Sequence, residues 1–186
     1  LILASNENDI LTRFFTSGVY SQGEVRPTLS PSMDIQVASN FERYLYYRLG
    51  EDSAAVCDHM DAFAAGEGIR IPLVAGEMDP LFSAGTGTTP DTLAAIKRCY
   101  DEHGYLLDPH TAAGYHIASQ HLKDDEPMVC LATAHPAKFG GAIMQAIGKD
   151  IAHHPILDAL GGLPARCDDL PADVDELKAH LLSHVA

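Results

Sequence analysis

The most constraining feature of the sequence is residues 128–139, MVCLATAHPAKF, where a short apolar run ends in small and polar residues before a proline. A continuous apolar run bounded by turn signals is typical of a strand that is buried on both faces of a parallel sheet. Pro136 suits the first turn of a helix, where its missing N–H costs nothing. The stretch therefore predicts a strand, a polar connection and a helix, and it indicates an α/β fold.

Polar side chains fall in the connection of this unit. In open parallel α/β sheets, ligands bind beyond the carboxyl ends of the strands. Thr133, His135 and Lys138 occupy that position, and their residue types alone favour none of the three. The stretch thus predicts an edge that faces a ligand without identifying the ligand.

Composition limits the class of protein and the kind of partner. The 186 residues, 46% of them hydrophobic, are enough for one domain with a core, which we expect to span residues 1–186. The formal charge of -14 argues against nucleic acid or an anionic membrane as a partner, because both require a cationic surface. The four cysteines form no closely spaced pair, which favours reduced thiols in a cytoplasmic protein.

Other segments show regular patterns. Residues 1–5 predict a buried strand, and a chain that starts in a strand is expected to be a piece of a longer protein. A short strand is expected at residues 69–74, and residues 82–91 are interpreted as a glycine-containing loop that leads into a helix. Helices are expected after Asn8, from residue 39 or 40 to Gly50, over residues 54–65, after a cap at Thr89, over residues 112–118, and after Asp173.

Several polar residues have a structural and a functional interpretation. Asn6 and Asn8 follow the first strand and either cap the next helix or face a ligand. Ser32, Asn40 and Arg43 either belong to turns and helix caps or build an anion-binding loop at a helix N-terminus. The spacing alone leaves both alternatives open.

Two spacing patterns bear on caps and metals. Ser39 and Glu42 are spaced as a capping box. His110 and His116 are six residues apart, which does not put two ligands on one face of a helix. The adjacent histidines at residues 153–154 point in different directions on any regular element. The sequence therefore predicts no metal site.

Three stretches together resemble a known family. In their order along the chain they are similar to the carboxyl-terminal half of threonine synthase, a pyridoxal-phosphate (PLP) enzyme of the tryptophan-synthase-β structural class. The similarity is weakest in residues 51–82 and after residue 140. The stretches are ASNENDILTRFF at residues 4–15, LSPSMDIQVASNFERYLYYRLG at residues 29–50, and the pair GYLLDPHTAAGYHIA and VCLATAHPAKF at residues 104–118 and 129–139.

The resemblance implies a fold, a reaction and a cofactor contact. The implied fold is part of the large domain of PLP-dependent fold type II, a three-layer α/β/α arrangement with a mostly parallel sheet. The implied reaction converts O-phospho-L-homoserine and water to L-threonine and phosphate, with pyridoxal 5'-phosphate as the electron sink. Thr133 matches the hydroxyl residue that hydrogen-bonds the pyridine nitrogen of the cofactor. The candidate substrate-binding residues are Ser32, Asn40, Arg43, His135 and Lys138.

The match omits the parts that hold the cofactor in this family. The segment with the Schiff-base lysine and the glycine-rich phosphate loop both lie upstream of the matched motifs. None of the five lysines of the chain stands in a context that resembles that of the cofactor lysine, and Lys138 is rejected because it follows the pyridine-nitrogen strand. We therefore expect no catalytic residue in the chain and no activity without the N-terminal half. The alternatives are a related PLP-dependent phospho-lyase for another phosphorylated amino alcohol and a non-catalytic binding module.

Overall fold

The computed structural model describes residues 1–76 and 78–185, which divide into two compact units, residues 1–154 and residues 155–186. The expectation of one domain over residues 1–186 remains a prediction. The first unit contains β1 Ile2–Ser5, α1 Ile10–Ser17, β2 Val19–Tyr20, η1 Pro31–Met33, α2 Phe41–Arg48, α3 Ser53–Ala64, β3 Ile69–Arg70, β4 Ser83–Thr86, α4 Thr89–His103, α5 Pro109–Ala118, η2 Pro136–Phe139 and α6 Gly140–Ile147.

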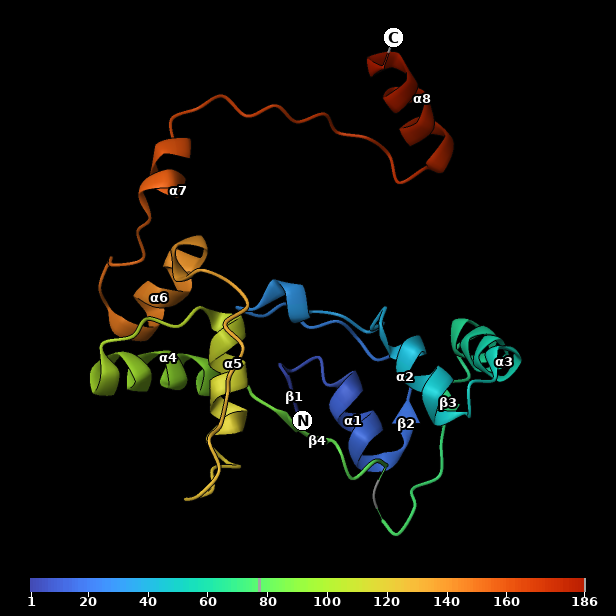
Figure 1. Ribbon diagram of the computed structural model, residues 1–186. Helices are drawn as coiled ribbons and strands as arrows, with labels where there is room; N and C mark the ends of the chain where they lie inside the picture. The colour runs from blue at the N-terminus through green and yellow to red at the C-terminus, as the bar shows by residue number, and fades with distance from the viewer. Residues whose placement is uncertain (77, 186) are drawn as a thin grey trace. The chain divides into compact units, whose positions relative to one another are not determined.

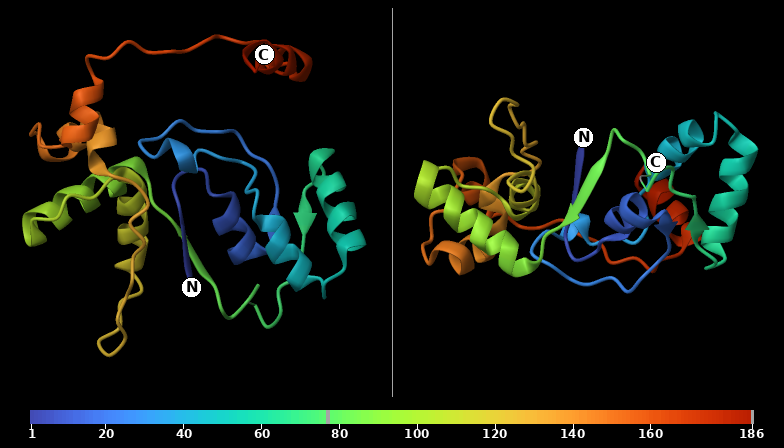
Figure 2. Two further views of the ribbon diagram at one scale, coloured as in Figure 1. Left: turned by 45° about the horizontal axis from the view of Figure 1, so that its top comes forward. Right: turned by 90° about the horizontal axis from the view of Figure 1, so that it is seen from below.

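A two-stranded parallel sheet lies in the middle of the first unit. β1 pairs with β4 in parallel, with Ile2 opposite Ser83 and Ser5 opposite Thr86. Figures 1 and 2 show α1 on one side of this pair and α4 and α5 on the other. The parallel pairing and the flanking helices confirm the predicted α/β class with helices on both sides of a sheet. A separate antiparallel pair joins β2 to β3, which is shorter than the strand predicted at residues 69–74.

The prediction of a loop at residues 82–91 is wrong for its first part, which forms β4. Its sequence, SAGT, has little intrinsic preference for a strand, so tertiary contacts decide its conformation. A Cβ atom on Gly85 would lie 2.8 Å from Cγ2 of Ile117, so glycine allows α5 to approach the sheet closely. The helix that follows is capped by Thr88, one residue before the expected position, in a capping box with Asp91.

The first hydrophobic core lies among α1, α2, α3 and the β2–β3 pair. The expected apolar stripe of α1 is confirmed, and Gly18 ends the helix in the left-handed conformation, with φ 74°. The ring of Phe41 stacks on Tyr20 at a centroid distance of 3.9 Å and meets Phe14 edge-on at 4.7 Å. The buried members are Ile10, Phe14, Tyr20, Ala38, Phe41, Leu45, Phe63, Ile69 and Met78.

A second core lies among α4, α5 and α6. Ile96, Ala112 and Ile143 are fully buried there, one from each helix. The helix expected after Pro136 is confirmed, although it begins as the 3₁₀ turn η2 and continues as α6. The small residues of α5 let α4 pack closely against it. The helices of the two cores lie on different sides of the β1–β4 pair, with α1 on one side and α4 and α5 on the other (Figure 1).

The predicted strand at residues 128–131 is wrong for the described part of the chain. The segment has no regular structure, and the side chains of Val129 and Leu131 are 79% and 78% exposed. Within the residues that the structure describes, β1 is hydrogen-bonded to β4 and to no other strand. The segment therefore lacks the neighbouring backbone that a strand requires.

The second unit contains α7 Pro155–Leu160 and α8 Val174–His184. The side chain of Asp173 accepts hydrogen bonds from the backbone amides of Asp175 and Glu176, which confirms the predicted cap of the last helix. All four cysteines of the chain are free thiols in this structure. Among the described residues, no helix has both the length and the apolar character needed to cross a membrane.

Candidate functional site

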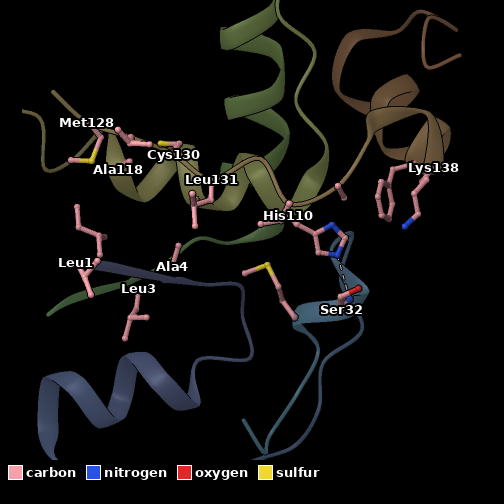
Figure 3. Close-up of a pocket in the computed structure, with 17 residues that line it drawn as sticks. Leu1, Leu3, Ala4, Ser32, His110, Ala118, Met128, Cys130, Leu131 and Lys138 are labelled. Atoms are coloured by element: carbon pink, nitrogen blue, oxygen red, sulfur yellow. Dashed lines mark hydrogen bonds between the residues drawn. The ribbon is translucent and has the colours of Figure 1, made fainter. Parts of the chain in front are cut away.

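A cavity of about 800 Å³ lies in the first unit, between β1 and the irregular residues 128–134. Figure 3 shows its lining, which comes from β1, η1, α5 and residues 128–139. Ser32 of η1 lies at one end of the cavity, and Leu1 and Met128 lie at the other end (Figure 3). Most of the lining is apolar, and a few polar groups converge on one end. Such a distribution is typical of a small-molecule site.

The structure brings some of the predicted site residues together. Ser32, Thr133 and Lys138 all line the cavity. The ammonium group of Lys138 lies 5.8 Å from the ring centroid of Phe139, another lining residue. These side chains come from two segments that lie far apart in the sequence, so only the fold could place them at one cavity.

The other predicted residues lie outside the lining of this cavity. Asn40 and Arg43 are exposed at the start of α2. The expected capping box of Ser39 with Glu42 is not formed, since the N-cap of α2 is Asn40, whose side chain makes no cap hydrogen bond. His135 caps η2, with Nδ1 accepting a hydrogen bond from the backbone amide of residue 137 at 3.2 Å.

Asn6 and Asn8 hold the loop that presents Ser32, and neither caps α1. The side-chain amide nitrogens of Asn6 and Asn8 donate to Oδ1 of Asp34 at 2.7 and 3.0 Å. Oδ1 of Asn8 accepts a hydrogen bond from the backbone amide of Arg26 at 2.8 Å. α1 itself begins after Asp9 without a side-chain cap. The polar residues beyond β1 therefore shape one wall of the cavity.

His110 lines the cavity, and the sequence analysis gave it no role beyond excluding a metal pair. Its Nε2 atom accepts a hydrogen bond from the backbone amide of Ser32 at 3.3 Å, drawn as a dashed line in Figure 3. Its Nδ1 atom lies 3.0 Å from Oδ1 of Asp108. The signal in the sequence was the run Asp108-Pro-His-Thr111 at the start of a helix of small residues.

Asp108 does not line the cavity but hydrogen-bonds His110, which does, and only 1% of its surface is exposed. Its carboxylate accepts hydrogen bonds from the backbone amides of His110 and Thr111, at 2.9 and 3.4 Å, and from the hydroxyl of Thr111. Burial raises the pKa of this carboxyl, but the hydrogen bonds outweigh burial and hold the pKa below its ordinary value. Asp108 is therefore ionised at neutral pH.

Thr111 connects this carboxylate to the predicted cofactor contact. The backbone amide of Thr133 donates a hydrogen bond to Oγ1 of Thr111 at 3.1 Å. The Thr111 hydroxyl in turn donates to Asp108. A continuous chain of hydrogen bonds thus joins residue 133, on one wall, to Ser32 on the other.

The second unit contains a group of side chains that the sequence analysis did not consider. Asp168, His180 and His184 each place a metal-ligating atom within 4.8 Å of the other two. The signal was the one-turn spacing of the two histidines on α8. Tetrahedral zinc requires ligand atoms about 3.3 Å apart, whereas the nearest Asp168 and His180 atoms are 3.7 Å apart and Asp168 is exposed. We therefore assign no metal to this group. The absence of a metal site, expected from the sequence, remains a prediction.

Comparison with known proteins shows which family this chain is similar to. A family model described as threonine synthase, C-terminal, matches residues 111–181. This range contains Thr133 and most of the segment after residue 140, where the similarity of the sequence motifs was weakest. The chain matches the carboxyl-terminal portion of threonine synthase. The resemblance expected from the motifs is thereby confirmed.

Curated threonine synthases match this chain along its whole length. The enzyme of Corynebacterium glutamicum is 36% identical over 196 residues, covering 100% of this chain and 40% of the relative. The enzyme of Pseudomonas aeruginosa is 38% identical over 187 residues, covering 99% of this chain and 40% of the relative. The chain therefore spans about 40% of the length of these relatives.

Solved threonine synthases have the same fold over this region. The PLP-bound threonine synthase from Brucella melitensis is 39% identical, with a TM-score of 0.85, over 99% of this chain and 40% of that one. Yeast threonine synthase is 29% identical, with a TM-score of 0.83, over 100% of this chain and 42% of that one. Both likenesses support the assignment to part of a PLP-dependent fold type II domain.

Proposed function

We propose that this chain is the carboxyl-terminal part of a threonine synthase, which converts O-phospho-L-homoserine and water to L-threonine and phosphate with pyridoxal 5'-phosphate. The observation that carries the proposal is the 39% identity, over 99% of the chain, to a PLP-bound threonine synthase. The proposed function implies two partners, the small-molecule substrate and the N-terminal part of the same enzyme. The isolated chain is inactive, because it spans about 40% of its relatives.

The cavity lining fits the aromatic ring of this cofactor. Apolar side chains from β1 and residues 128–131 line the cavity, and Thr133 offers a hydroxyl beside them. Thr133 would hold the pyridine nitrogen with a neutral hydroxyl, which does not keep that nitrogen protonated as a carboxylate would. The bound cofactor supplies an electron sink for carbanions, and a neutral contact moderates it.

Other lining residues fit the anionic substrate. Lys138 brings a positive charge to the end of the cavity where Ser32 and His110 also lie. A cation there offsets part of the repulsion that a chain of formal charge -14 exerts on a phosphate ester. The lysine that binds the cofactor and the loop for the cofactor phosphate would come from the part of the enzyme that this chain does not span.

Phosphate release from O-phospho-L-homoserine tests the proposal. We expect release of phosphate and formation of threonine by the complete gene product, and neither by the 186-residue chain. Activity of the isolated chain would contradict its proposed dependence on the rest of the enzyme. Formation of a keto acid and ammonia from another phosphorylated amino alcohol would identify the related phospho-lyase instead.

Variants of Thr133 test the cofactor contact in the complete protein. Thr133→Val removes the hydroxyl at nearly constant volume and is expected to weaken PLP affinity by about tenfold, the effect of one hydrogen bond. Thr133→Ser keeps the hydroxyl and should retain the affinity. Equal affinities for the two variants would exclude Thr133 as a cofactor contact.

A further inference from the structure

We propose that Asp108, His110 and Thr111 form a positioning element that fixes the two polar walls of the cavity, at Ser32 and Thr133, relative to each other. The inference rests on the proposed function, because Thr133 is there the contact to the cofactor. Asp108 lies at the centre of the element, and the side chains of the other two residues hydrogen-bond to its two carboxylate oxygens.

The first arm runs from Asp108 through Thr111 to Thr133. A hydroxyl carries one proton, and the Thr111 hydroxyl directs it to the carboxylate, which can only accept. Oγ1 of Thr111 then accepts from the backbone amide of Thr133 at 3.1 Å. The ionised carboxylate thus orients the hydroxyl so that its lone pairs are available to residue 133.

The second arm runs from Asp108 through His110 to Ser32. Because the carboxylate accepts, Nδ1 of His110 carries the hydrogen on that side, at 3.0 Å. Nε2 then has a free lone pair, which accepts the backbone amide of Ser32 at 3.3 Å. The ring is further held against Phe139, at a centroid distance of 4.9 Å. The arrangement assigns His110 the neutral tautomer that is protonated at Nδ1.

The element does more than cap α5. An aspartate cap needs only the backbone amides of the first turn, as Asp52 uses them at the start of α3. Asp108 also binds the side chains of His110 and Thr111, and all three residues are buried. Hydrogen bonds to an ionised, buried acceptor are among the strongest in proteins.

Residue 133 lies in a segment that needs support from outside the sheet. Residues 128–134 are irregular, and no strand of the described chain pairs with them, so sheet hydrogen bonds do not fix Thr133. Binding groups need to be held within about 0.5 Å of their productive position by a supporting shell. The hydrogen bond to Thr111 supplies such support from a rigid helix.

Hydrogen exchange in the complete gene product without cofactor tests the positioning. Thr111→Val keeps the backbone amides that α5 needs for its cap and removes the hydroxyl. We expect exchange of the residue 133 amide, followed in a peptide covering residues 128–135, to become about tenfold faster, the effect of one hydrogen bond. Thr111→Ser should restore slow exchange, and Thr92→Val, at a buried threonine of α4, should leave it unchanged. Unchanged exchange in Thr111→Val overturns the proposal.

Two further readouts separate this inference from the proposed function. PLP affinity of the complete protein should fall about tenfold in Thr111→Val and not in Thr111→Ser. If the unmodified protein binds no PLP while the exchange effect is present, the proposed function fails and the positioning stands. If PLP binds equally well to all variants, the positioning role is overturned.

Nitrogen NMR shifts of His110 should report protonation at Nδ1, and protonation at Nε2 would overturn the arm to Ser32.

Discussion

β1 and residues 128–131 are two short apolar segments that line the same cavity, and only β1 is a strand. β1 is hydrogen-bonded to β4 along its length, whereas residues 128–131 have no strand beside them within the described residues. The comparison teaches that a pairing partner, and not apolar sequence alone, makes a strand.

The largest effect on this comparison is expected from Asp108→Ala, which removes the anchor that links α5 to the unpaired segment. We expect the free energy of unfolding to fall by about 3 kcal/mol, because a helix cap and buried, charge-assisted hydrogen bonds are lost together. Urea denaturation of the complete protein measures it. Asp52→Ala removes an exposed cap of the same type and should cost about 1 kcal/mol. Equal losses would contradict an anchoring role for Asp108.

A smaller effect is expected at the paired strand. Gly85→Ala places a Cβ atom 2.8 Å from Cγ2 of the buried Ile117, which should lower the free energy of unfolding by about 1–3 kcal/mol through overpacking. Gly114→Ala on α5 meets nothing within 4 Å, so it should be neutral or stabilise by up to about 1 kcal/mol. Thermal denaturation of both variants decides whether the close approach of α5 to β4 is required.

Acid should reduce the stabilising contribution of Asp108, and the loss should be smaller than that caused by Asp108→Ala. The pKa of Asp108 in the folded protein is held below its ordinary value, so the folded state binds that proton less readily than the unfolded state. Its stabilising contribution is fully present above the unfolded pKa of about 3.9 and is lost as pH falls through the lower folded value. Denaturation midpoints below pH 4 should therefore depend less on pH in Asp108→Asn. An unchanged slope would contradict the shift.

The smallest change in stability is expected at the unpaired segment. Leu131→Lys alters a side chain that is 78% exposed, so the free energy of unfolding of the isolated chain should change by less than about 0.5 kcal/mol. Self-association of that chain, followed by sedimentation velocity, should decrease, since an exposed apolar segment without a partner promotes pairing between copies. A loss above about 2 kcal/mol would show that the segment is buried in solution.

Local patterns sufficed for much of the fold. The stripe of Ile10 and Phe14, ended by Gly18, predicted α1, and the Asp173 cap predicted the start of α8. Apolar spacing after Pro136 predicted the helix that buries Ile143. These features depend on residues within a few positions of one another, so the sequence contains their physical cause. The family motifs also singled out Thr133, which the structure places at the cavity.

Only the tertiary structure decided which segments become strands and which polar residues meet. The sequence SAGT forms β4 because it pairs with β1 and packs against α5. Residues 128–131 are irregular because no strand of the described chain lies beside them. His110 is positioned by hydrogen bonds with Ser32 and Asp108. Asn8 does not cap α1 as expected, and it hydrogen-bonds the loop that contains Ser32 instead. Such contacts depend on residues that are far apart in the sequence, and local spacing does not determine where those residues lie in the fold.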